Sequence, residues 1–386
     1  MNNKFARLLD TFTAWSFYQS ALFFFKRVQV SSNPTSKTAA SLETPPTTPK
    51  PPSDHLPSTN FDVVAFYNDL IRDDPTITPP IAAIESLIEL LAKTRLTTIS
   101  ETLALLSTHS QKLLASQRNP IPLSAGTDLF QRYLVSSFQQ RPSSLADSDF
   151  HTLRDHILSN SSLFVKRANE ARLKIAHCAL PFVKEESTIF TYGYSRVVRT
   201  LLTHAAEANR YFNVVYVLPS KGLSETIAKS IGALNKLGIP TTTISLQALT
   251  YALASLPFGS PPPQFIVGAT AVLENGSIIT ELGTHQIGLT AKAFSIPLHV
   301  AVESYKFVRN FPLGYGPLDL ARMGVEQDIL QFTTDMDGSK NSDHEELPDG
   351  KQMVEITPPE LIDALITENG ILTPKAISEE LIKLWF

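Results

Sequence analysis

The sequence contains almost no cysteine: Cys178 is the single one among 386 residues. One thiol excludes an internal disulfide framework and any metal site built from several thiolates. This composition fits a reducing compartment, in which disulfides are rare. Cys178 lies in the apolar run IAHCAL, so we expect its side chain to act as a small buried hydrophobe.

The sequence also lacks a large excess of either charge. It carries 33 Lys and Arg residues against 37 Asp and Glu residues, which gives a formal net charge of −4. No basic block with regularly placed aromatic residues stands out, so the bulk charge does not indicate a nucleic-acid-binding protein.

The N-terminal part lacks an apolar run long enough for a membrane span. Residues 11–25 are apolar and aromatic, but they fall short of the about 20 residues that cross a bilayer as a helix. No small-residue cleavage site follows, so a secretory signal is not expected. The flanking cations Lys4, Arg7, Lys26 and Arg27 leave a mitochondrial-type leader as the lesser alternative to a mispredicted gene start or an added extension.

Proline, serine and threonine dominate residues 31–58, and this composition predicts an extended, disordered linker. Residues 1–60 are therefore assigned to an extension and linker. We expect the folded chain to begin near Phe61.

Residues 61–180 show apolar residues at the spacing of amphipathic helices. The last of these helices is expected to run from Asp149 to Ala179. The pattern predicts an N-terminal helical bundle of ordinary domain size. Its clearest stripe consists of Ile81, Ile84, Leu87, Ile88 and Leu91.

Residues 181–386 show short apolar runs that alternate with helical stretches. This alternation predicts a Rossmann-like α/β domain with a mostly parallel sheet. Ligands of such sheets bind just beyond the C-terminal ends of the strands. The residues expected at those ends are 191–196, 219–221, 268–270 and 303–306.

The C-terminal part of this predicted domain contains an acidic segment, residues 335–350, which is expected to be a solvated loop. A short helix is expected near Glu360 to Thr367. A C-terminal helix should run from Pro374 to Trp385, with Thr373 as its N-cap.

Several stretches resemble one family. Val267–Phe307 (VGATAVLENGSIITELGTHQIGLTAKAFSIPLHVAVESYKF) is similar to a region shared by the alpha, beta and delta subunits of eukaryotic translation initiation factor 2B and two isomerases, which act on methylthioribose 1-phosphate and ribose 1,5-bisphosphate. TYGYSRVV at Thr191–Val198 and SAGTDLFQRYL at Ser124–Leu134 also match. The segment Glu303–Leu313 and the tail Gly370–Phe386 most resemble the alpha branch of the family.

The resemblance implies where isomerase chemistry would be located. The isomerases use a Cys in the loop after the first strand and an Asp in a VGAD motif, and these positions here are Gly193 and Thr270. An aldose–ketose interconversion needs one group to move a proton and another to protonate or polarise the sugar oxygen. Glycine has no side chain, and a threonine hydroxyl does not titrate near neutral pH. We therefore expect no catalytic residue and no enzyme activity.

The resemblance also implies a sugar-phosphate ligand in this cleft, without any other cofactor. A hydroxyl, a guanidinium and helix N-terminal amides would converge on a phosphate at Ser195 and Arg196. A structural ion pair or a helix-surface cation is an equally open interpretation of Arg196. Glu303 and Lys306 could line the cleft or pair with each other. The candidate ligand-binding residues are Thr191, Ser195, Arg196, Thr270, Glu303 and Lys306.

Two departures from the family pattern weaken the expectation of a phosphate ligand. Thr280-Glu281 replaces an Asn-Lys pair that is common in the family, so an anion stands where a cation is usual. Lys221-Gly222 fits the loop expected after the second strand only loosely. His285 and His299 lack a ligand cluster around them, so no metal site is expected.

The resemblance implies a regulatory, non-catalytic subunit of the guanine-nucleotide exchange complex that acts on translation initiation factor 2. It implies a cytosolic homodimer that joins beta and delta subunits and helps to sense the phosphorylated alpha subunit of initiation factor 2 in the integrated stress response. Neither nucleic acid nor a membrane is an expected partner. Two alternatives remain, a sugar-phosphate isomerase with relocated catalytic groups and a stand-alone sugar-phosphate-binding sensor.

Overall fold

The computed structural model describes residues 61–74, 77–94, 96–139, 166, 168, 170–257, 261–327 and 353–385. The predictions for residues 1–60, for most of the helix before residue 170 and for the acidic segment 335–350 lie outside these residues.

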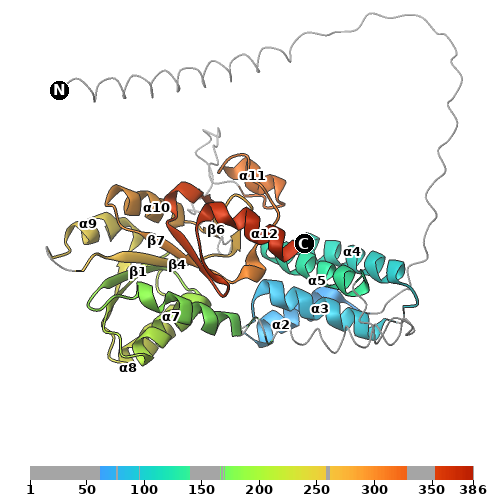
Figure 1. Ribbon diagram of the computed structural model, residues 1–386, viewed down its shortest axis with the longest axis horizontal. Helices are drawn as coiled ribbons and strands as arrows, with labels where there is room; N and C mark the ends of the chain where they lie inside the picture. The colour runs from blue at the N-terminus through green and yellow to red at the C-terminus, as the bar shows by residue number, and fades with distance from the viewer. Residues whose placement is uncertain are drawn as a thin grey trace, which may run out of the picture. The chain divides into compact units, whose positions relative to one another are not determined.

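Helices come first along the described chain, as predicted. They are α2 (Val63–Asp73), α3 (Pro79–Lys93), α4 (Ile99–Ser116) and α5 (Ile121–Gln139), followed by a helical stretch at 170–179 (Figure 1). The apolar stripe of α3 is confirmed as its packing face, because four of its five residues are buried and Ile88 packs against them.

A seven-stranded sheet follows in the order β10-β9-β7-β4-β1-β2-β3. All neighbouring strands are parallel except β9 and β10, which are antiparallel, so the predicted mostly parallel α/β fold is confirmed. In chain order the strands are β1 (Thr188–Tyr192), β2 (Asn213–Leu218), β3 (Thr241–Ser245), β4 (Gln264–Gly268), β7 (Leu298–Ala301), β9 (Ala364–Thr367) and β10 (Gly370–Leu372).

Helices cover both faces of this sheet, because alternate strand residues point to opposite sides. One face packs against 170–179, α7 (Arg196–Glu207) and α8 (Glu225–Lys236). The other packs against α9 (Leu249–Ala254), α10 (Thr284–Ala293) and α12 (Ile377–Trp385). The rings of Phe190 and Phe265, with centroids 5.3 Å apart, join β1 and β4 within the second core.

The strand order reverses next to β1. The chain moves outward from β1 to β2 and β3, and then returns to place β4 on the other side of β1. The loops that leave β1 and β4 therefore separate at a topological switch point, where α/β sheets bind their ligands.

A second, antiparallel sheet was not predicted. It has the order β5-β6-β8 and consists of β5 (Ala271–Val272), β6 (Ile278–Glu281) and β8 (Val354–Thr357). Helix α5 packs against β5 and against the single turn η4 (Ser304–Lys306), so the helical part contacts the sheet part. The domain boundary near residue 180 stays a prediction.

The predicted helix from Glu360 to Thr367 was wrong. The structure has a single turn, η5 (Pro359–Leu361), followed by strand β9. Leu365 and Ile366 are fully buried on opposite faces of the sheet, beside β7, so tertiary pairing outweighs the local helical spacing. A C-terminal helix is confirmed, but α12 begins at Ile377 rather than Pro374, after the turn η6 (Pro374–Ala376), and the side chain of Thr373 makes no capping hydrogen bond.

Candidate ligand-binding cleft

A cavity of about 610 Å³ lies at the switch point. The sheet part contributes the residues that follow β1 and β4, together with the end of β6. The helical part contributes Thr78 and Pro79 at the start of α3, and residues 116–119 at the end of α4. This volume is in the range of about 300–1,000 Å³ that is usual for small-molecule sites.

Four of the six predicted site residues line this cavity. They are Ser195, Arg196, Thr270 and Lys306, and Gly193 lines it as well. The other two do not: Thr191 is buried within β1, and Glu303 is buried with an exposed fraction of 0%. The structure therefore brings most of the predicted residues together. Glu303 does not line the cavity itself, but it pairs with Lys306, which does.

Ser195 is held at the N-terminus of α7. Its Oγ accepts a hydrogen bond from Val198 N at 3.4 Å and so caps the helix. A β carbon on Gly268 would lie only 2.2 Å from this oxygen, so Ser195 can approach the end of β4 only because residue 268 is glycine. The positive end of the α7 dipole faces the cavity at this point.

Arg196 joins the two parts of the chain. Its guanidinium donates a hydrogen bond to the carbonyl oxygen of Ile77, just before α3. Burial and the nearby guanidinium of Arg172 both lower the pKa of Arg196. Arg196 thus combines a structural contact with a position on the cavity wall.

Glu303 and Lys306 pair with each other, and Lys306 also lines the cavity. Lys306 Nζ lies 2.8 Å from Glu303 Oε2 and donates to the carbonyl of Ala269 at 3.1 Å. Glu303 Oε1 accepts from Tyr305 Oη at 3.0 Å and lies 3.3 Å from Arg172 Nε. Burial opposes ionisation of Glu303, but the charges of Lys306 and Arg172 outweigh it and lower its pKa.

Glu281 brings a negative charge into the same cavity from the end of β6. Burial raises the pKa of Glu281, and the ammonium of Lys221 opposes this shift in part. Thr280, which also lines the cavity, has a buried hydroxyl with no hydrogen-bond partner among the described residues. Thr280 and Glu281, the two residues that depart from the family pattern, therefore both line the cavity.

Gly193 provides no side chain at the end of β1. Its φ of +58° lies in the left-handed region, which disfavours residues with a β carbon. The nearest atom to a β carbon built there would be Glu281 Oε2, at 3.8 Å. Thr270 instead is fixed by its backbone, which donates to the carbonyl of Ile279 at 2.9 Å.

The helical wall of the cavity was missed in the sequence. Thr78, Arg118 and Asn119 reach the site from positions far from the strand ends. No local motif marks them, because only the packing of the helical part against the sheet brings them there. Tyr192, which lies within the predicted strand-end stretch 191–196, also lines the cavity, and its hydroxyl donates to the carbonyl of Leu282.

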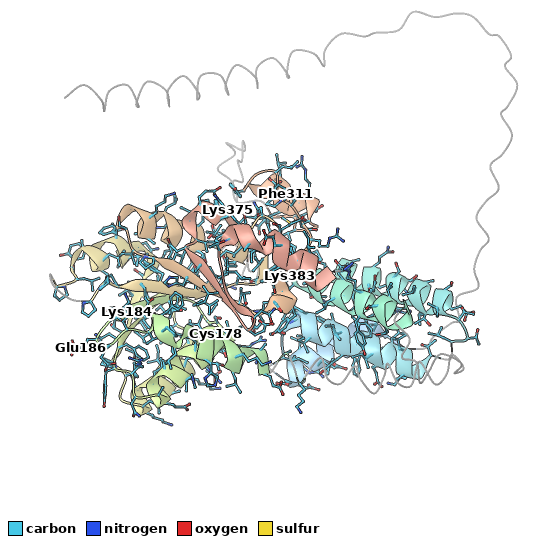
Figure 2. All side chains as sticks on the ribbon, viewed as in Figure 1. Cys178, Lys184, Glu186, Phe311, Lys375 and Lys383 are labelled. Atoms are coloured by element: carbon cyan, nitrogen blue, oxygen red, sulfur yellow. The ribbon has the colours of Figure 1, made fainter. Side chains whose placement is uncertain are left out.

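His299 and Cys178 both make packing contacts. His299 packs edge-on against Phe182, with ring centroids 4.7 Å apart, and burial lowers its pKa. Cys178 is half-buried on the stretch 170–179 beside α7 (Figure 2). Within the described part of the chain, no group of three or more metal-ligating side chains is found, and no helix is long and apolar enough to cross a membrane.

Comparisons with known proteins point to one family. A family model described as Initiation factor 2 subunit family matches residues 72–374. The chain is 31% identical over 328 residues to translation initiation factor eIF2B subunit alpha of Dictyostelium discoideum, covering 84% of this chain and 98% of that protein. It is 28% identical over 324 residues to the subunit of the same name in Caenorhabditis elegans, with the same two coverages of 84% and 98%.

Solved structures show the same fold. The structure of eIF2B beta from Chaetomium thermophilum has a TM-score of 0.65 at 16% identity and covers 84% of this chain and 92% of that one. A chain of the tetrameric eIF2B-beta2-delta2 complex from the same organism has a TM-score of 0.64 at 18% identity and covers 83% and 94%. At these identities the likeness concerns the fold alone.

Proposed function

The chain belongs to the initiation factor 2 subunit family, and we propose that it acts as the alpha-type regulatory subunit of the exchange factor for translation initiation factor 2. One observation carries this proposal: the match extends over 98% of the alpha subunit from Dictyostelium discoideum at 31% identity. A shared fold alone would not distinguish the alpha type from the beta and delta types.

The partners follow from the proposed role. The chain would form a homodimer in the cytosol and join beta and delta subunits, in line with the solved complex of those two subunits. Size-exclusion chromatography of the full chain with beta and delta subunits tests this. Co-elution is the expected result, and separate elution at micromolar concentrations would contradict the assembly.

The cavity supports a binding role rather than catalysis. Its Arg196 and the α7 N-terminus suit a phosphate, and Lys306 adds a second cation to the wall. We therefore propose a sugar phosphate as the ligand. Arg196→Ala should weaken its binding by about 1.5 kcal/mol or more, the value of a charge-assisted hydrogen bond. Unchanged calorimetric affinity would remove Arg196 from the site.

One observation favours an isomerase as the second candidate function. Glu281 is a carboxylate with a raised pKa near Gly193, the position of the isomerase cysteine. A proton transfer needs a second group on the sugar oxygen, and Thr270 is a poor one. We expect no turnover of ribose 1,5-bisphosphate or methylthioribose 1-phosphate above the spontaneous rate. Turnover that disappears in Glu281→Gln would establish the second candidate instead.

A further inference from the structure

The cavity is lined by groups of unlike charge. Ser195 and Arg196 line it where β1 passes into α7. Glu281 lines it where β6 passes toward α10, with its Oε2 3.8 Å from a β carbon built on Gly193. A cavity of about 610 Å³ can hold a small molecule that contacts both kinds of group at once.

The N-terminus of α10 is already satisfied by a carboxylate of the protein. Glu355 Oε1 accepts hydrogen bonds from Gly283 N at 2.8 Å and from His285 N at 2.7 Å. Glu355 lies on β8 opposite Thr280 of β6, next to Glu281. The N-terminus of α10, where Thr284 lines the cavity, therefore already holds a carboxylate, and the helix dipole that would attract an anion is offset there.

The Glu281 carboxylate is half-buried and has no direct partner in the part of the chain that the structure describes. Among these residues, no hydrogen bond or ion pair within 4.0 Å involves its side-chain oxygens. Lys221, on the exposed loop after β2, acts on it only through space. The neighbouring Thr280 is only 4% exposed, and its hydroxyl also has no partner among the described residues. The half-buried carboxylate of Glu281 is thus available to a ligand in the cavity.

We propose that the cavity selects a ligand that carries both a phosphate and an amine, an amino sugar phosphate by chemical class. This inference rests on the proposed ligand-binding role of the cavity. The phosphate lies at Ser195 and Arg196, where the α7 dipole adds to the guanidinium charge. The ammonium pairs with Glu281. A sugar phosphate that carries a hydroxyl in place of the amine leaves this carboxylate without a counter-charge.

Isothermal titration calorimetry of the full chain tests the proposal with glucosamine 6-phosphate and glucose 6-phosphate, which differ by an amine against a hydroxyl. The amino sugar phosphate should bind about tenfold tighter, as expected for one added charge-assisted contact. Glu281→Gln should bring the ratio of the two affinities to about one, and Glu281→Lys should reverse their order. Glu225→Gln is the matched control, because Glu225 is an exposed carboxylate on α8 that pairs with Lys229; it should keep the ratio.

The outcomes separate this inference from the function on which it rests. Equal affinities that Glu281→Gln does not change would overturn the amine preference and leave phosphate binding intact. Absence of binding by both ligands would overturn both. A preference for the amino sugar phosphate that persists in Glu281→Gln would also overturn the role of this residue. A thermal melt of each variant checks that the variant is folded.

Discussion

A β carbon on residue 268 would lie 2.2 Å from Ser195 Oγ and 2.6 Å from its Cβ. Gly268→Ala should therefore displace the first turn of α7 or strain the end of β4. We expect the free energy of unfolding to fall by about 1–3 kcal/mol, the usual cost of overpacking. Chemical denaturation measures this change, and phosphate binding should weaken in the same variant.

Gly232 provides the control for this substitution. It lies inside α8, where a β carbon would meet no atom of the described chain beyond its own helix within 4 Å, and its φ is ordinary. Gly232→Ala should keep or raise stability by up to about 1 kcal/mol, because alanine favours a helix interior. Equal losses in both variants would show that the contact with Ser195 has no special cost.

Glu303 should make stability depend on pH. The charges of Lys306 and Arg172 lower the pKa of Glu303 in the folded chain. The stabilisation by its carboxylate is therefore complete above the pKa in the unfolded chain, about 4.3, and is lost as the pH falls through the lower pKa in the folded chain. Glu303→Gln leaves two cations without their carboxylate and should cost about 3–5 kcal/mol near neutral pH. Urea denaturation at several pH values should show this difference shrinking in acid.

A difference between Glu303→Gln and wild type that stays constant down to about pH 3 would contradict this account. Glu225→Gln serves again as the exposed control, since an ion pair between exposed side chains contributes little to stability. The comparison separates a buried charge cluster from a general acid effect on the whole chain.

At the scale of elements, α4 has a complete capping box. Thr98 Oγ1 accepts from Glu101 N at 3.2 Å, and the Glu101 carboxylate accepts from Thr98 N at 3.2 Å. Thr98→Ala should cost about 1 kcal/mol of unfolding free energy. Ser107→Ala, at an exposed position within the same helix, should change it by less than about 0.5 kcal/mol. Equal effects would show that the cap does not stabilise α4.

The elements that the sequence predicts well are those with a strong local period. The stripe of α3 and the parallel strands are visible because each depends on residues close together in the chain. The strand Ala364–Thr367 was predicted as a helix because one of its two pairing partners, β7, lies more than 60 residues away. The sheet β5-β6-β8 was missed for a similar reason, since β5 is only two residues long and β8 is distant in the chain.

Only those cleft residues that lie at strand ends were predicted from the sequence. These residues follow from the rule that ligands bind at the C-terminal edge of a parallel sheet, and this rule places Ser195 and Arg196 in the site. The pairing of Glu303 with Arg172 depends on residues 131 positions apart, and the contribution of Thr78 depends on how the helical part packs. Neither has a local signal.

At the scale of the whole molecule, polar contacts couple the cleft to the helical part. Arg196 donates to the carbonyl of Ile77, and Thr78 Oγ1 donates to Tyr305 Oη at 3.4 Å. Both contacts join the segment before α3 to cavity residues or their immediate neighbours. A ligand in the cavity is therefore well placed to stabilise the helical part against the sheet.

The proposed regulatory role gives a last prediction for the assembled complex. Nucleotide exchange on initiation factor 2 should slow when its alpha subunit is phosphorylated, and this slowing should require the present chain. The reason is that a regulatory subunit acts through a coupling between binding and exchange, typically about 1–3 kcal/mol, which corresponds to about 5–150-fold. Release of labelled GDP from the phosphorylated and unphosphorylated factor, with and without this chain, measures the effect. Equal slowing in its absence would assign the sensing to the other subunits and leave this chain a role in assembly alone.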